Sequence, residues 1–119
     1  MKQIVKGLAV AAALALPGLA LANGSPQVKA AMTSAGCFAC HAVNHKVVGP
    51  AYSWVAYMFA HKAGAKVTLA HKIIDGGAGR WNAWTGGIPM VAHPGMSLAT
   101  AEKMAAWVLQ QKPVAPPKP

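Results

Sequence analysis

Acidic residues are scarce in this 119-residue sequence, where only Asp75 and Glu102 oppose 11 lysines and arginines and the formal net charge is +9. A chain with so few carboxylates carries an almost unopposed positive charge, which attracts partners of the opposite sign. We therefore expect acidic protein partners.

Long hydrophobic runs are absent after the first 22 residues. Within residues 1–22, Lys2 and Lys6 precede an apolar stretch over residues 7–16, and a small-x-small pattern ends at Ala22. This order is typical of a secretory signal peptide, and its apolar run is too short to span a bilayer. We expect cleavage after Ala22, export to the periplasm, and a mature chain without stable membrane insertion. Nucleic acid is not an expected partner for an exported protein.

Cysteine is also scarce, since the chain has only Cys37 and Cys40. A disulfide between them would close a very small loop, which restricts the unfolded chain less than a long loop does. A structural disulfide is therefore an unattractive interpretation, even in an oxidising compartment. The 97 residues that follow the signal peptide are few for a self-sufficient hydrophobic core, so we expect a bound group to help hold the domain together.

The alternation of apolar and polar residues that marks a β-strand is missing, and no internal repeat is present. Apolar residues recur instead with helical spacing, which predicts an all-α fold. Side chains suited to begin or stop a helix mark the expected boundaries. They predict four helices, with caps at Ser25, Ser53, Thr68 and Ser97, a stop for the first helix at Gly36 and an end of the second near Gly64.

Two segments are not expected to be helical. Six glycines between residues 76 and 96 predict a long structured loop. After a domain that covers residues 23–112, residues 113–119 are too rich in proline to continue a helix. We expect this proline-rich tail to be disordered.

Cys37, Cys40 and His41 form a C-x-x-C-H run, which is the attachment signature of c-type haem. The two thiols add across the two vinyl groups of the porphyrin, and a spacing of about one helical turn presents both sulfurs to the same edge. His41 is then carried under the ring, where its imidazole can bind the iron as the proximal ligand. We predict one haem c, bound covalently through both cysteines.

A redox-active thiol pair is the alternative interpretation of the same run, with His41 as a neighbour that lowers a cysteine pKa. That motif belongs beside a βαβ pattern, which this sequence lacks. The alternative protein would be a colourless thiol oxidoreductase or metal-binding protein.

The sixth ligand of the iron separates an electron carrier from a haem enzyme. Met90 follows Pro89 in the glycine-rich loop, far enough from His41 to reach the other haem face, and we predict that it is the distal ligand. Met96 is the rival in the same loop, but it directly precedes the cap of the last helix. His93 would be the ligand if both methionines were excluded.

With these residues in hand, the chain resembles the class I cytochromes c of the short bacterial monohaem type. The resemblance implies an all-α fold in which short helices wrap one haem and the first and last helices cross near Gly36 and Trp107. It is carried, in order, by residues 36–41, 46–52, 76–81, 88–90 and 106–109.

The resemblance also implies roles for residues around the haem. The carbonyl of Pro50 should accept a hydrogen bond from the ring nitrogen of His41 that faces away from the iron. Trp81 and Lys72, by their matching positions, would reach a haem propionate.

Three features depart from the family pattern. Met32 replaces the usual aromatic residue of the first helix, residues 82–85 look like an insertion, and Val91 and Ala92 follow Met90 where prolines are typical. The loop that presents the distal ligand therefore differs most. Trp84 within the insertion would either cap the haem edge or pack on the loop.

The resemblance implies a carrier of single electrons, with a membrane cytochrome bc complex as donor and a terminal oxidase or nitrite reductase as acceptor. With His41 and Met90 in both axial positions, no site remains for a substrate, so we expect a monomeric carrier and no enzyme. The alternative is a haem-based ligand-binding protein, sensor or enzyme subunit with a labile distal position. A basic rim would steer acidic partners towards the haem edge. We expect this rim to be formed by Lys46, Lys62, Lys66, Lys72 and Arg80.

Overall fold

The computed structural model describes residues 25–119, so the predicted signal peptide lies outside the described residues. Within the described part the chain is helical and has no β-strand, which confirms the all-α expectation. None of the helices in this range is long and apolar enough to cross a membrane. The elements are α2 (Pro26–Ser34), the 3₁₀-helix η2 (Cys37–Ala39), α3 (Tyr52–Phe59), α4 (Ala65–Asp75), α5 (Asn82–Thr85) and α6 (Leu98–Leu109).

The first and last helices begin where the sequence predicts. The Ser25 hydroxyl accepts a hydrogen bond of 3.2 Å from the backbone N–H of Val28, and Pro26 occupies the first turn of α2. The Ser97 hydroxyl accepts a bond of 3.1 Å from the N–H of Thr100 at the start of α6. Each serine satisfies an N–H that has no partner inside its helix, so both predicted caps are confirmed.

The predicted starts of the two middle helices were wrong. α3 begins at Tyr52, and the Ser53 hydroxyl is buried without a hydrogen-bond partner, so it caps nothing. α3 also ends at Phe59, before a turn in which His61 has a left-handed φ of 63°. α4 begins at Ala65, with Gly64 as its N-cap residue in a left-handed conformation, earlier than a Thr68 cap would allow.

The glycine-rich loop contains one helical turn that the sequence pattern did not predict. α5 covers residues 82–85, the same four residues that look like an insertion. The N–H of Thr85 donates 3.0 Å to the Trp81 carbonyl, and Gly86 ends the turn in a left-handed conformation. The additional residues are thus accommodated as a compact turn.

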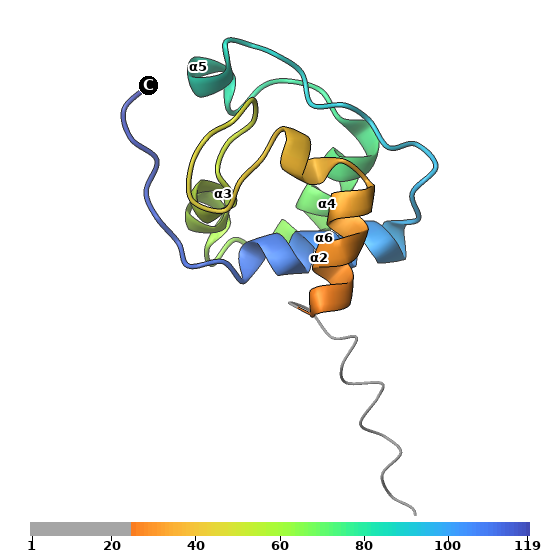
Figure 1. Ribbon diagram of the computed structural model, residues 1–119. Coiled ribbons are helices and arrows are strands. Elements are labelled where there is room, and N and C mark those ends of the chain that lie inside the picture. Colours follow the sequence, from red (N-terminus) through yellow and green to blue (C-terminus); the bar gives the residue numbers. More distant parts are fainter. Residues whose placement is uncertain (1–24) are drawn as a thin grey trace, which may run out of the picture.

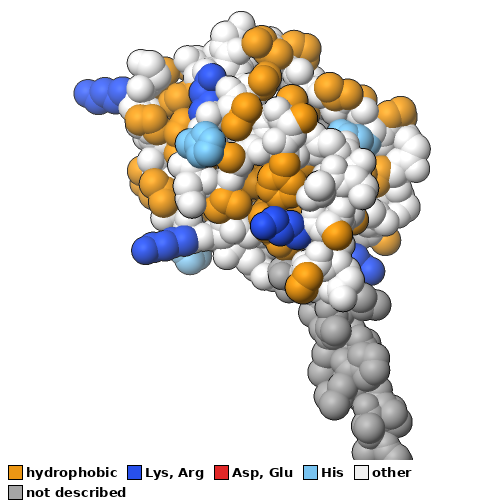
Figure 2. Space-filling model, viewed as in Figure 1, with side chains coloured by type: hydrophobic (Ala, Val, Ile, Leu, Met, Phe, Trp, Pro, Cys, Tyr) orange, Lys and Arg blue, Asp and Glu red, His pale blue; other side chains and the backbone are white. Residues whose placement is uncertain are grey.

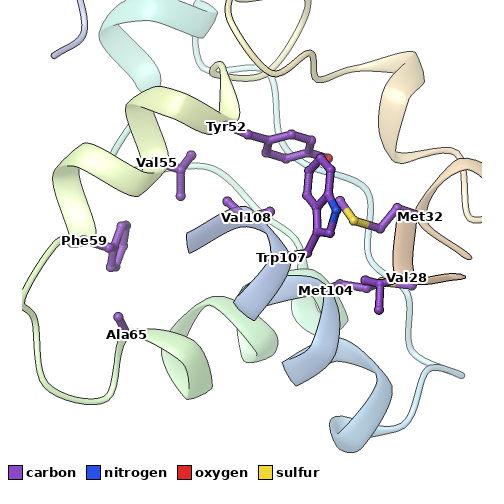
Figure 3. Close-up of a cluster of buried hydrophobic side chains, with 9 residues drawn as sticks. All are labelled: Val28, Met32, Tyr52, Val55, Phe59, Ala65, Met104, Trp107 and Val108. Carbon is purple, nitrogen blue, oxygen red and sulfur yellow. The ribbon is translucent and has the colours of Figure 1, made fainter. Parts of the chain in front are cut away.

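The core lies where α2, α3 and α4 pack on α6 (Figure 1). α2 crosses α6, which confirms the predicted arrangement of the first and last helices. Met32, the unusual residue of α2, is almost fully buried in this core. Figure 3 shows the side chains of the core pointing towards one another. They are Val28, Met32, Tyr52, Val55, Phe59, Ala65, Met104, Trp107 and Val108.

Three aromatic rings connect this core to the C-x-x-C-H segment. Phe38 meets Tyr52 at a centroid distance of 5.8 Å and Trp107 at 6.0 Å, and Tyr52 meets Trp107 at 5.8 Å. All three pairs are edge-to-face, an arrangement that contributes about 0.5–1.5 kcal/mol per pair beyond area burial. Because Phe38 lies between the two cysteines, the contacts fix this segment against α3 and α6.

The C-terminal tail over residues 113–119 is extended and has no helix, as its prolines predict. It lies against the domain through two hydrogen bonds. The N–H of Val114 donates 3.0 Å to the carbonyl of Ser53, and the indole N–H of Trp84 donates 2.7 Å to the carbonyl of Pro117. The predicted disorder concerns the motion of the tail and stays a prediction.

Candidate functional site

The two cysteines are presented by a tight turn after α2. Gly36 takes a left-handed φ of 83°, which turns the chain out of α2 and into η2. The N–H groups of Cys40 and His41 then both donate to the carbonyl of Cys37, at 3.2 and 3.1 Å. Both thiols are free and half-buried. This winding brings the two sulfurs and the His41 ring to one side of the segment.

These side chains line a cavity of about 700 Å³. Its walls come from the end of α2, the C-x-x-C-H turn, α4 and the loop that follows α4, so segments distant in sequence meet around it. Every residue that the sequence analysis assigned to the site lines this one cavity: Cys37, Cys40, His41, Pro50, Lys72, Trp81 and Met90.

His41 is oriented by its surroundings. Its Nδ1 lies 2.8 Å from the carbonyl oxygen of Pro50, and a carbonyl only accepts, so Nδ1 carries the proton and Nε2 carries the lone pair. Burial lowers the pKa of the His41 imidazole, and the Pro50 hydrogen bond opposes that shift only in part. The neutral imidazole that a metal ion requires is therefore favoured.

Two further contacts restrict the His41 ring. Gly49 lies so close that a Cβ atom there would be 2.5 Å from Cε1 of the ring, which explains the glycine at this position. The Tyr52 ring also stacks on His41 at a centroid distance of 4.9 Å and an interplanar angle of 17°. The sequence pattern does not predict this stacking, although Tyr52 belongs to the run 46–52 that carries the family resemblance.

Met90 reaches the cavity from a loop that is hydrogen-bonded to the end of α4. Its N–H and carbonyl pair with the carbonyl and N–H of Gly77, both at 2.9 Å. Gly76 allows this approach, because a Cβ there would lie 2.5 Å from the Met90 carbonyl oxygen. Met96 is outside the cavity lining and packs against the hydrophobic core.

Trp81 and Lys72 approach the cavity from the loop and from the last turn of α4. The Trp81 ring packs between Trp54, at a centroid distance of 6.5 Å, and Trp84, at 5.5 Å. Trp84 packs on Trp81 and is outside the cavity lining, which selects loop packing over the haem edge for this residue.

The environment of Cys37 disfavours thiol redox chemistry. Burial raises the pKa of the Cys37 thiol, although hydrogen bonds from its own backbone and from Tyr52 oppose the shift. Reactive cysteines have the opposite property, a lowered pKa that supplies thiolate. Among residues 25–119, no group of three or more His, Cys, Asp and Glu side chains could hold a metal ion by itself.

Comparison with known proteins identifies the family, although no family model matches the chain. The chain is 44% identical over 80 residues to cytochrome c2 of Rhodocyclus tenuis, which covers 66% of this chain and 86% of that protein. It is 38% identical over 112 residues to cytochrome c-552 of Nitrosomonas europaea, which covers 94% of this chain and the whole of that protein. The chain belongs to the class I cytochrome c family. This is a family of small monohaem electron-transfer proteins.

The same relationship is visible in three dimensions. The crystal structure of Nitrosomonas europaea cytochrome c552 superposes on this class I cytochrome with a TM-score of 0.63 and 38% identity, covering 70% of this chain and 98% of that one. The likeness spans nearly the whole of the solved domain, which confirms the class I fold.

Haem c is the cofactor of this cytochrome, and the cavity fits it in three respects. Two free thiols stand at the C-x-x-C spacing for thioether attachment. Beside them a histidine keeps the lone pair of Nε2 available, because its Nδ1 is bonded to Pro50. The cavity volume of about 700 Å³ is also in the range of cofactor sites.

Proposed function

We propose that this cytochrome is a periplasmic carrier of single electrons in which His41 and Met90 would hold the haem iron. The observation that carries the proposal is that both side chains line one cavity, although they come from segments on either side of α3 and α4. When bound there, haem would supply one reversible electron through the ferrous and ferric states of its iron. A thioether ligand favours the ferrous state and raises the potential.

The protein's part in this function is to hold both ligands in place. Pro50 and Gly49 fix the orientation of His41, and the paired hydrogen bonds with Gly77 fix the backbone of Met90. Because ligands held in this way move little, the reorganisation energy of electron transfer stays low. With His41 and Met90 both holding the iron, no ligand position would be left for a substrate, which supports a carrier and no enzymatic activity.

Lys72 and Trp81 are proposed to hold a haem propionate. Both line the cavity, and Lys72 lies in the last turn of α4, where its ammonium group can reach a carboxylate. The indole N–H of Trp81 is a hydrogen-bond donor for the same group.

The proposed partners are acidic proteins that dock transiently on a monomer. In Figure 2 the face that is drawn carries Lys and Arg side chains beside apolar ones, and no acidic side chain is visible outside the grey atoms. Such a surface steers encounter without a large permanent interface. We propose a membrane cytochrome bc complex as donor and a terminal oxidase or nitrite reductase as acceptor.

The optical spectrum of the exported holoprotein tests the ligand set. We expect a c-type spectrum with the weak far-red methionine-to-iron band in the oxidised form, and slow binding of carbon monoxide to the reduced form. M90A should lose the band and bind carbon monoxide readily, whereas the matched variant M96A should keep the band. A wild-type protein without the band that binds carbon monoxide rapidly would instead be a ligand-binding haem protein.

A further inference from the structure

The imidazole ring of His93 lies between the C-terminal ends of two helices. Its Nδ1 is 3.1 Å from the carbonyl oxygen of Ile73 in α4, and its Nε2 is 3.3 Å from the carbonyl oxygen of Ala35, the C-cap residue of α2. The backbone N–H of His93 donates a third bond, 2.9 Å long, to the carbonyl of Ile74. One residue thus contacts three carbonyl groups from two helix ends.

These carbonyls need donors from elsewhere, because the last four C=O groups of a helix have no partner within it. They also lie at the negative end of the helix dipole, where an N–H donor or a cation is favoured. A neutral imidazole can donate a hydrogen bond to only one of the two carbonyl oxygens beside the ring, those of Ile73 and Ala35. An imidazolium can donate to both. His93 therefore acts as a shared cap for the C-terminal ends of α2 and α4.

The shared cap joins the two sides of the haem cavity. Ala35 lies two residues before Cys37, on the segment that carries the proximal ligand, and His93 lies three residues after Met90, on the distal loop. Ala35, Ile73 and His93 all line the same cavity as the ligands. The contact between Ala35 and His93 joins segments that lie 58 residues apart in the chain.

We propose that His93 is a positioning residue that clamps the distal loop against the proximal segment and so keeps Met90 over the cavity. The proposal rests on the proposed function in that Met90 is taken as the distal ligand. The paired bonds with Gly77 and the backbone bond to Ile74 do not involve the His93 ring. Because these bonds remain, loss of the ring loosens the loop while the domain stays folded.

The test uses the holoprotein and four variants. H93A removes the ring, and H93Q returns a side-chain amide that can donate to one of the two carbonyls. H61N is the matched control, because His61 is exposed and its left-handed φ of 63° suits asparagine. V28A, in the buried core of α2, controls for a general loss of stability.

Two readouts are measured on each variant. Amide hydrogen exchange followed by mass spectrometry reports on the loop directly, and cyanide binding to the ferric protein reports on access to the distal side of the iron. We expect H93A to exchange about tenfold faster over residues 88–96 and to bind cyanide about tenfold faster, since the ring contributes one to two hydrogen bonds. H93Q should recover part of both effects, and H61N should match the wild type.

The outcomes separate the clamp from the ligand assignment. Unchanged amide exchange over residues 88–96 in H93A overturns the clamp. The clamp is also overturned if exchange there rises no more in H93A than in V28A when the two variants are compared at equal thermal stability. If wild-type protein lacks the far-red methionine band, the ligand assignment fails. Exchange in H93A still decides whether His93 clamps the loop, because that readout does not depend on the iron.

Discussion

The indole nitrogen of Trp84 donates a hydrogen bond of 2.7 Å to the carbonyl oxygen of Pro117, which connects the helical turn α5 to the C-terminal tail. Both partners lie in segments that stand outside the main helical framework. Trp84 belongs to the four residues that look like an insertion, and Pro117 belongs to the proline-rich tail. Because Trp84 also packs on Trp81, the tail is coupled through this bond to a residue of the haem cavity.

A double-mutant cycle should detect this bond. W84F keeps an aromatic ring against Trp81 but loses the N–H, and we expect the free energy of unfolding to fall by about 1 kcal/mol, the net value of one hydrogen bond. Removal of residues 116–119 deletes the acceptor while it keeps the bond from Val114 to Ser53. Guanidinium unfolding followed by circular dichroism gives all four free energies. Fully additive effects would show that the bond contributes nothing.

The close approach of Gly49 to His41 predicts a sharp sensitivity at this position. G49A places a methyl group 2.5 Å from Cε1 of the imidazole, so the ring or the backbone has to move. We expect a loss of about 1–3 kcal/mol in the free energy of unfolding, together with a changed haem spectrum. G95A is the matched control, because a Cβ there meets no atom within 4 Å. Equal effects of the two substitutions would contradict the steric explanation.

Removal of the haem should unfold most of the domain. Without it, a cavity of about 700 Å³ would remain at the centre of a small core, and the apolar groups that line it would lose their packing partners. The variant C37A/C40A cannot form the thioether bonds, and its far-ultraviolet circular dichroism should show little helix. A helical spectrum with a cooperative thermal transition would mean that the polypeptide alone supplies enough core.

Electrostatic steering should make electron transfer to an acidic protein acceptor sensitive to salt. We expect the second-order rate in stopped-flow experiments to fall as ionic strength rises, because exposed charges are screened beyond about 10 Å at 0.1 M salt. K46Q/R80Q should lower the rate at low salt more than K112Q/K118Q, which removes the same charge near the C-terminus. The reason is position, because Arg80 lines the haem cavity and Lys46 lies two residues before Val48, which also lines it. The two double variants should converge at high salt. A rate that does not respond to salt would argue against steering.

Features that depend on neighbouring residues could be predicted from the sequence. The caps at Ser25 and Ser97 and the helices that follow them need only a hydroxyl within one turn of an unpaired N–H. The haem attachment segment is equally local, since Cys37, Cys40 and His41 lie within a single turn.

Boundaries in the middle of the chain could not be predicted in the same way. Ser53 and Thr68 are good capping residues, yet α3 and α4 begin before them. Tyr52 enters α3 because its ring is buried between Phe38 and Trp107, and this burial outweighs the local preference of a serine for the cap position. Packing against α6 therefore decided where α3 starts.

The sequence by itself determined the helical class, the outer helices and the haem attachment segment. Only the tertiary structure decided which side chains meet from distant segments. It brings Met90 to the cavity of His41, the ring of His93 to Ala35, and Trp84 to Pro117. The physical reason is range, because caps and turns are satisfied within a few residues, whereas these contacts form only after the helices have packed around a common core.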